Sequence, residues 1–309
     1  MNITQENINP FLNKYISLID SICEEYHYEA NIKHLLYLIV PAFIVKYGPS
    51  NEHAILDCFK KVKIYISGKT DKIVAASFNR TLNKNTNGYY TEKYVSINNY
   101  SNSSLPALID NIVHEFNHAI NSLNNEISYD DKVVKVRTGL STLNYDRATL
   151  RFIGKSKEIS LEEVLNTTQT EEIIDIINSF GKYSIDNMEF SNMLYALKNE
   201  IKGNNYVSDA YNYQKYVCDE LIKNKTFTPT INNLRLKGFI EDIPNLFDNV
   251  IGREGSYKRL NELLDEVHIL VLKYTKAKFF KDRLLNKIRS KSNDVIALIK
   301  EYDSKCIFK

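Results

Sequence analysis

The sequence predicts an α+β fold that is mainly helical, with two lobes and a small mixed or antiparallel sheet ahead of a central helix. Three observations support this prediction. Apolar residues recur at helical spacing near both ends of the chain, whereas residues 62–99 contain alternating or β-branched runs. In addition, a chain of 309 residues, 43% of them hydrophobic, can bury a large core.

The first 60 residues predict helices, and the residues that follow predict strands. Apolar residues at helical spacing occupy residues 8–25, 34–47 and 54–60. The period then changes, because residues 62–66 and 94–97 alternate or are β-branched, and glycine and asparagine between them supply turns. These strands form the predicted sheet.

A strongly amphipathic helix follows the predicted sheet. Ser103 and Ser104 with Pro106 are typical of a helix start, and Asn124 and Asn125 are a plausible end. At about 100° per residue, one set of apolar residues falls within an arc of roughly 100°. This set is Ile109, Ile112, Val113, Phe116, Ile120 and Leu123. The opposite side is polar and carries no Lys or Arg, which suits a cleft better than a solvated surface.

The remaining chain predicts one hairpin and then helices. Residues 132–140 and 149–153 resemble paired strands around residues 144–146. A second helix begins near Ser160. Helical spacing continues over residues 170–180, 187–201, 207–223, 257–274 and 276–302. We therefore expect one region at 1–180 and a helical C-terminal lobe at 181–309.

The polar side of the amphipathic helix carries the motif His114-Glu115-Phe116-Asn117-His118. Positions i and i+4 of a helix lie one above the other, so His114 and His118 can bind one Zn²⁺ at about 2.0–2.1 Å each. Glu115 lies beside them, where it can act as a general base. The motif predicts a catalytic zinc site.

A catalytic zinc has three protein ligands, and the best third candidate is Glu163. The segment 160–167 (SLEEVLNT) then resembles the gluzincin superfamily of zinc peptidases, in which a helical Glu well after H-E-x-x-H completes the site. That pattern implies Glu163 as ligand, with Asn166 and Thr167 in supporting positions. Thr167 stands where several family members carry an acid. The resemblance covers roughly residues 94–170.

Two alternatives to Glu163 remain open in the sequence. Ser160 and Glu163 also match a capping box, in which Glu163 would accept a hydrogen bond from the Ser160 backbone. The adjacent Glu162 would then be the fallback ligand. The metzincin pattern is absent, because Leu123 and Glu126 follow the motif instead of a further Gly and His.

The resemblance implies a zincin-like catalytic region at 1–180 that contains both metal helices. It implies a zinc-dependent peptidase with one Zn²⁺ per chain, acting on a peptide or protein substrate. Residues 75–79 are the candidate edge strand for the peptide backbone. Tyr145, Tyr211 and His268 are candidates for the donor that stabilises the oxyanion.

A second interpretation is an inactive, peptidase-like protein that zinc stabilises and that serves as a binding or scaffold protein. The retained Glu115 argues against it, because a purely structural zinc has no use for a base. A third interpretation is a hydrolase of other amide substrates with the same zinc chemistry.

Composition limits the partners and the compartment. The 40 basic and 38 acidic residues give a net charge of +2, which predicts neither a nucleic-acid nor a membrane partner. The four cysteines are scattered, which argues against disulfides or a thiolate zinc site. With no signal peptide visible and no apolar stretch long enough to span a bilayer, the expected location is cytoplasmic. The basic helix at 276–291 is expected to be a solvated face, with an acidic partner as the alternative.

Overall fold

The computed structural model describes residues 2–67, 72–75, 78–81, 88–91, 94–98, 104–122, 128–129, 132–146, 148–149, 153, 159–203 and 211–306. It divides into two compact units. Residues 1–120 and 169–208 form the first unit, and residues 121–168 and 209–309 form the second. The boundary at 168/169 falls inside one continuous helix. The predicted functional regions 1–180 and 181–309 stay a prediction.

The first unit is built mainly of helices around an aromatic core. Its elements are α1 (Gln5–Asn13), α2 (Ile16–Tyr26), α3 (Ala30–Tyr47), the short 3-10 helix η1 (Pro49–Asn51), α4 (Glu52–Lys61), β1 (Lys63–Ser67), β2 (Lys72–Ala75), β3 (Phe78–Thr81), β4 (Gly88–Thr91), β5 (Tyr94–Asn98), α5 (Leu105–Ile120), the second half of α6 (Ile159–Phe180) and α7 (Met188–Gly203). Phe59 of α4 joins the helices, because its ring packs edge-on against Phe43 at 5.5 Å and stacks on Phe116 at 4.2 Å. The apolar face of α5 is thus held against α4.

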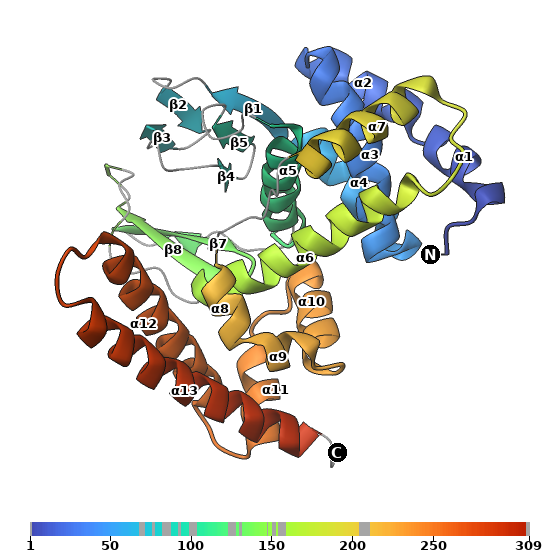
Figure 1. Cartoon of the computed structure of the whole chain (residues 1–309). Coiled ribbons are helices and arrows are strands. Elements are labelled where there is room, and N and C mark those ends of the chain that lie inside the picture. The colour runs from blue at the N-terminus through green and yellow to red at the C-terminus, as the bar shows by residue number, and fades with distance from the viewer. Residues whose placement is uncertain are drawn as a thin grey trace. The chain divides into compact units, whose positions relative to one another are not determined.

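The second unit contains a hairpin and a helical bundle (Figure 1). Its elements are β6 (Ser128–Tyr129), β7 (Val133–Thr138), β8 (Ser141–Asp146), the first half of α6, α8 (Asn212–Val217), α9 (Asp219–Lys223), α10 (Phe227–Lys237), α11 (Asp242–Ile251), α12 (Ser256–Lys276) and α13 (Lys281–Cys306). Phe247 of α11 stacks on Tyr302 of α13 at 4.4 Å, and Phe227 meets both rings edge-on. α12 and α13 run side by side as a long helical hairpin (Figure 1).

The predicted α+β class is wrong, because the described chain is overwhelmingly helical. Its strands have two to six residues and pair in three small groups, β1-β5-β4 ahead of α5, β2-β3, and β6-β7-β8. They form no single sheet that could serve as a layer of the fold. The physical reason is that the helices themselves carry a large apolar core, as in α3, which buries eleven residues between Ile32 and Ile44.

Two strand predictions are wrong in detail. The candidate edge segment 75–79 is not one strand, since Ala75 of β2 pairs with Phe78 of β3 and the chain folds back on itself. The predicted hairpin exists, but it turns at Gly139-Leu140 instead of 144–146, and β8 replaces the strand expected at 149–153. Gly139 has a φ of 56°, which allows the tight turn.

Most helices lie where the apolar periodicity predicts them, with three differences. The stretch 8–25 forms two helices, α1 and α2, instead of one. The described part of the stretch 207–223 also forms two helices, α8 and α9, and α10 and α11 were not predicted. In the described ranges, no helix combines the length and the apolar composition needed to cross a membrane.

Candidate metal centre

The start of α5 is held by hydrogen bonds to the preceding serine and to a glutamate on another helix. Ser104 caps the helix, because its Oγ accepts a hydrogen bond from Ala107 N at 3.4 Å and its carbonyl oxygen accepts one from Leu108 N at 3.0 Å. The carboxylate of Glu200 on α7 accepts another from Leu105 N at 2.8 Å. These bonds orient the helix that carries the motif.

Most of the polar side of α5 is buried, although His114 is half-buried. Glu115 is 6% exposed, Asn117 0% and His118 7%. The helix ends at Ile120, three residues before the predicted end. Because buried polar groups need partners, the buried residues on this side of α5 must face other polar groups of the protein.

Asn117, inside the motif, ties α5 to two other helices. Its Oδ1 accepts a hydrogen bond from the hydroxyl of Tyr47 on α3 at 2.8 Å, and its Nδ2 donates to Oγ1 of Thr170 on α6 at 3.0 Å. Both bonds are made by a fully buried side chain. They hold α6 against the same side of α5 that carries the histidines.

Glu163 precedes Thr170 by seven residues on the continuous helix α6. Seven residues are about two turns, so the two side chains share a helix face. One ligand atom each from His114, His118 and Glu163 lies within 4.8 Å of the others. The two imidazole rings stand edge to face, with centroids 5.0 Å apart and planes at 78°. The structure therefore brings together the three residues predicted as ligands.

The donor set of this cluster suits zinc. Two imidazole nitrogens and one carboxylate oxygen are the ligands of many catalytic zinc sites, and on a tetrahedral zinc such atoms are roughly 3.3–3.6 Å apart. A group within 4.8 Å needs only small side-chain rotations to reach that spacing. His114 and Glu163 are half-buried, whereas His118 is buried, so the cluster is reachable from solvent. That these residues hold a metal stays a prediction.

The carboxylate of Glu162, the fallback ligand, binds residues of the protein other than the two histidines. Its carboxylate forms a buried ion pair with Arg235 of α10, through the Nη2 contact and a second bond from Nε at 3.0 Å. It also accepts a hydrogen bond from Leu140 N at 2.8 Å. A Cβ on Gly139 would lie 2.3 Å from this carboxylate, so the turn needs glycine. We call Glu162, Arg235, Gly139 and Leu140 the closed cluster.

The capping-box alternative is also wrong. Both the backbone N and the hydroxyl of Ser160 bond to Oδ1 of Asp265 on α12, at 3.3 Å and 2.6 Å. The Ser160 backbone therefore has a different acceptor, and Glu163 lies with the histidines. Adjacent glutamates at the start of α6 thus point to different environments.

Thr167 lies one turn after Glu163, at the position where the gluzincin pattern places a supporting side chain. It is 2% exposed, and its Oγ1 has no hydrogen-bond partner within the part of the chain that the structure describes. A buried hydroxyl without a partner costs free energy. Because positions i and i+4 share a helix face, this hydroxyl lies on the face of α6 that carries Glu163.

His268 and Tyr211, two of the three candidate oxyanion donors, lie together. Their rings stack with centroids 5.3 Å apart. Burial lowers the pKa of His268, although the carboxylates of Asp265 and Glu163 act in the opposite direction. Nδ1 of His268 lies 2.8 Å from Nε2 of Gln214. The side chain of the third candidate, Tyr145, lies outside the described residues.

Sequence reasoning missed three residues that shape the site: Asn117 as an anchor, Arg235 as the partner of Glu162, and Asp265 as the partner of Ser160. The position of Asn117 inside the motif was a usable signal. Arg235 and Asp265 are 73 and 105 residues from their partners, and no local pattern connects them.

No protein-family model, curated protein or solved structure matches this chain. The resemblance to gluzincins therefore stays a prediction based on the motif residues, and the function must be argued from the site.

Proposed function

We propose that this protein is a zinc-dependent peptidase whose metal ligands are His114, His118 and Glu163. The observation that carries the proposal is the convergence of these three side chains from two helices, with their ligand atoms within 4.8 Å of one another. Glu115, one residue after the first ligand on a buried helix, supplies a reason for an enzyme in preference to a structural metal site.

When bound, zinc supplies a positive charge that activates water and polarises a carbonyl group. The carboxylate of Glu115 accepts a proton from the water as it attacks the scissile carbonyl carbon. The same carboxylate then delivers that proton to the nitrogen of the leaving amine. Asn117 keeps α5 against α6, so it positions the histidines relative to Glu163.

His268 is the proposed donor to the oxyanion. With Gln214 Nε2 donating to Nδ1, the neutral imidazole carries its proton on Nε2, where it can donate to a developing negative charge. The lowered pKa favours this neutral form near neutral pH. Tyr211 stacks on the ring and holds its orientation.

The first experiment measures metal content. Protein dialysed against zinc and then gel-filtered should contain about one zinc per chain by plasma mass spectrometry. His118→Ala and Glu163→Gln should lose it, whereas His53→Ala and Glu220→Gln, two exposed controls, should keep it. Wild-type protein without zinc, or unchanged zinc in His118→Ala and Glu163→Gln, would refute the metal site.

The second experiment separates the peptidase from an inactive zinc-binding scaffold. Wild type and Glu115→Gln, both loaded with zinc, are incubated with reduced, carboxymethylated casein, and new termini are identified by mass spectrometry. We expect cleavage to fall by roughly 10²–10⁴-fold in Glu115→Gln, with zinc retained. Equal cleavage by both proteins would remove Glu115 as the base. Zinc without cleavage in wild type would favour the scaffold.

A further inference from the structure

The free end of the α12–α13 hairpin is both apolar and strongly basic. We call residues 269–291 the hairpin tip: the last turns of α12, the connection 277–280 and the first turns of α13. Eight of the chain's 40 basic residues but only one of its 38 acidic residues lie there, a net charge of +7. Since the whole chain carries +2, the other residues together carry −5. The near-neutral net charge of the whole chain therefore hides a strongly basic segment at the hairpin tip.

Apolar side chains are exposed among these charges. Phe279 is 77% exposed and Phe280 80%, the two highest values among the large hydrophobic side chains that the structure describes. Ile269 and Leu272, at 41% and 44%, extend the apolar surface along α12. Leaving four such side chains in water at one end of a hairpin is costly unless something covers them.

The backbone at the tip also indicates that a partner covers the exposed aromatic rings. Phe280 has a φ of 61°, a left-handed conformation that a bulky side chain rarely adopts. The ring is 80% exposed, so packing against the described residues offsets little of that strain. The strained residue directs an aromatic ring outward beside a second one.

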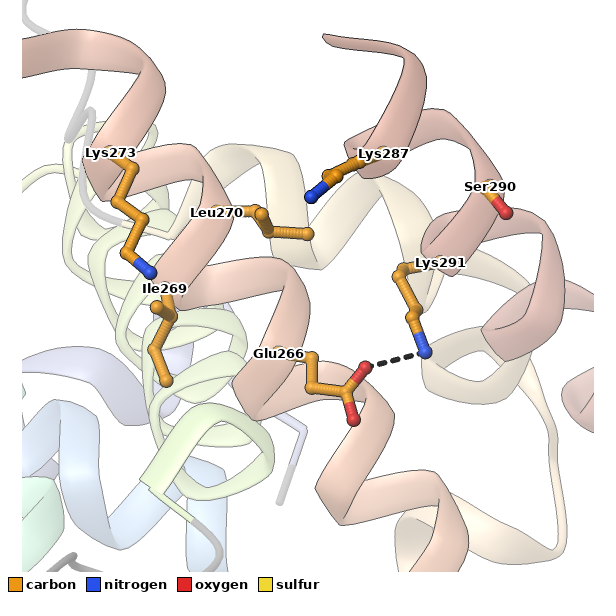
Figure 2. Close-up of a pocket in the computed structure, with 7 residues that line it drawn as sticks. All are labelled: Glu266, Ile269, Leu270, Lys273, Lys287, Ser290 and Lys291. Carbon is orange, nitrogen blue, oxygen red and sulfur yellow. Dashed lines mark ion pairs between the residues drawn. The ribbon is translucent and has the colours of Figure 1, made fainter. Parts of the chain in front are cut away.

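Two shallow grooves continue from the tip along α12. One, of about 400 Å³, lies between α12 and α13 and is lined by Glu266, Ile269, Leu270, Lys273, Lys287, Ser290 and Lys291. Figure 2 shows Lys287 and Leu270 extending toward each other across it, while Lys291 pairs with Glu266 at 2.7 Å. The other, of about 390 Å³, is lined by Ile269, Leu272, Lys273, Lys276 and Ala277. Both combine an aliphatic floor with lysines.

Most basic side chains of the tip form no ion pair with the residues that the structure describes. Among the described residues, Lys291 is the only basic side chain of the tip in an ion pair. Lys281 lies over the ring of Tyr274 at 5.3 Å, and Lys276 and Lys278 are exposed. These charges can attract an anionic surface.

We propose that the hairpin tip binds the surface of a membrane that contains anionic lipids. Phe279 and Phe280 enter the boundary between headgroups and acyl chains, and the lysines around them contact the lipid phosphates and carboxylates. Exposed aliphatic side chains beside the aromatic pair favour lipid over nucleic acid, which would stack bases on the rings alone. The protein lies on the membrane and does not span it. Binding to a membrane surface departs from the sequence-based expectation that the net charge of +2 predicts no membrane partner.

The test uses the full chain and flotation with vesicles of phosphatidylcholine, with or without 30% phosphatidylserine. Wild type should float only with the anionic vesicles, and 0.5 M salt should release most of it. Lys276→Gln/Lys278→Gln/Lys281→Gln should lower partitioning by roughly 100-fold. Phe279→Ser/Phe280→Asn removes both aromatic rings and should lower partitioning by roughly 10-fold or more. Asn is chosen at position 280 because it tolerates the left-handed backbone.

Two matched controls keep the test specific. Tyr195→Ser/Tyr216→Ser removes aromatic rings that are 70% and 73% exposed elsewhere, and Lys223→Gln/Lys225→Gln/Lys237→Gln removes three exposed lysines of the second unit. Both should float like wild type. Failure of wild type to bind anionic vesicles overturns the proposal, and so does equal binding by the tip variants. Binding of a single-stranded oligonucleotide in place of vesicles, lost in the tip variants, would assign the tip to nucleic acid.

Discussion

Two polar clusters share the first turns of α6, and they differ in burial and in the side chains that surround each glutamate. The closed cluster surrounds Glu162, whose carboxylate is 1% exposed and bonds to Arg235 and to Leu140 N. The metal-candidate cluster surrounds the next residue, Glu163, which is half-buried and lies with two histidines. Adjacent residues of the same type therefore have different environments.

This difference indicates which cluster stabilises the fold and which is available to a ligand. A buried carboxylate with a guanidinium partner and a backbone donor is a complete structural unit, and nothing further can bind to it without disrupting it. A half-buried carboxylate beside two imidazoles is a set of electron-pair donors on one face. Loss of the first should lower stability, and loss of the second should lower metal affinity.

The largest expected effect is on the closed cluster. Arg235→Met leaves the Glu162 carboxylate buried without its cation, so the free energy of unfolding should fall by about 3–5 kcal/mol in urea titrations. The double variant Glu162→Leu/Arg235→Met removes both charges and should regain most of that loss. A loss below about 1 kcal/mol in the single variant would show that the ion pair is not structural.

The next effect concerns the glycine that packs against the closed cluster. Gly139→Ala places a Cβ 2.3 Å from the Glu162 carboxylate at a φ of +56°, so both strain and a clash arise. We expect a loss of about 2–3 kcal/mol in thermal or urea unfolding.

Gly252→Ala is the matched control for Gly139→Ala. Its φ is +72°, but nothing lies within 4 Å of the added Cβ, so it measures the backbone strain alone, about 1 kcal/mol. Equal losses in the two variants would mean that the contact with Glu162 contributes nothing.

A smaller effect tests the support of the metal-candidate cluster. Asn117→Ala removes the bonds to Tyr47 and Thr170, so stability should fall by about 1–3 kcal/mol and zinc affinity by about 10-fold or more. Exposed Asn245→Ala should change stability by less than about 0.5 kcal/mol. Zinc affinity that is unchanged in Asn117→Ala, measured by competition with a chelating dye, would show that Asn117 does not position the histidines.

The sequence predicts those parts of the site that depend on local spacing. His114, Glu115 and His118 share a helix because they lie within five residues, and the serine at its start and the apolar stripe define that helix. The choice of Glu163 over Glu162 depends on Arg235, 73 residues away, and on Leu140 N, both visible only in three dimensions. The fold class was wrong because the β-branched runs form only short strands, whereas helices make up most of the described chain.

The smallest effect concerns His268, whose ring interacts electrostatically with Glu163 of the metal-candidate cluster. Burial holds its pKa in the folded protein below the ordinary value of 6.5, so the neutral ring is favoured. The stability that this gives is complete above pH 6.5 and is lost as the pH falls through the lowered pKa, because the unfolded chain takes up the proton first. Solvent screens the half-buried ring, so the effect is modest.

To isolate the contribution of His268, the free energy of unfolding is compared at pH 7.5 and pH 5.0, in protein kept free of metal by a chelator. His268→Gln also loses the stack on Tyr211, but that loss is the same at both pH values and cancels. Wild type should therefore lose more stability than His268→Gln on acidification, whereas the exposed control His53→Gln should follow wild type. Parallel losses in wild type and His268→Gln would mean that His268 is protonated as readily in the folded as in the unfolded chain. The neutral Nε2 donor assigned to the oxyanion would then lose its physical basis, while the metal ligands on α5 and α6 would be unaffected.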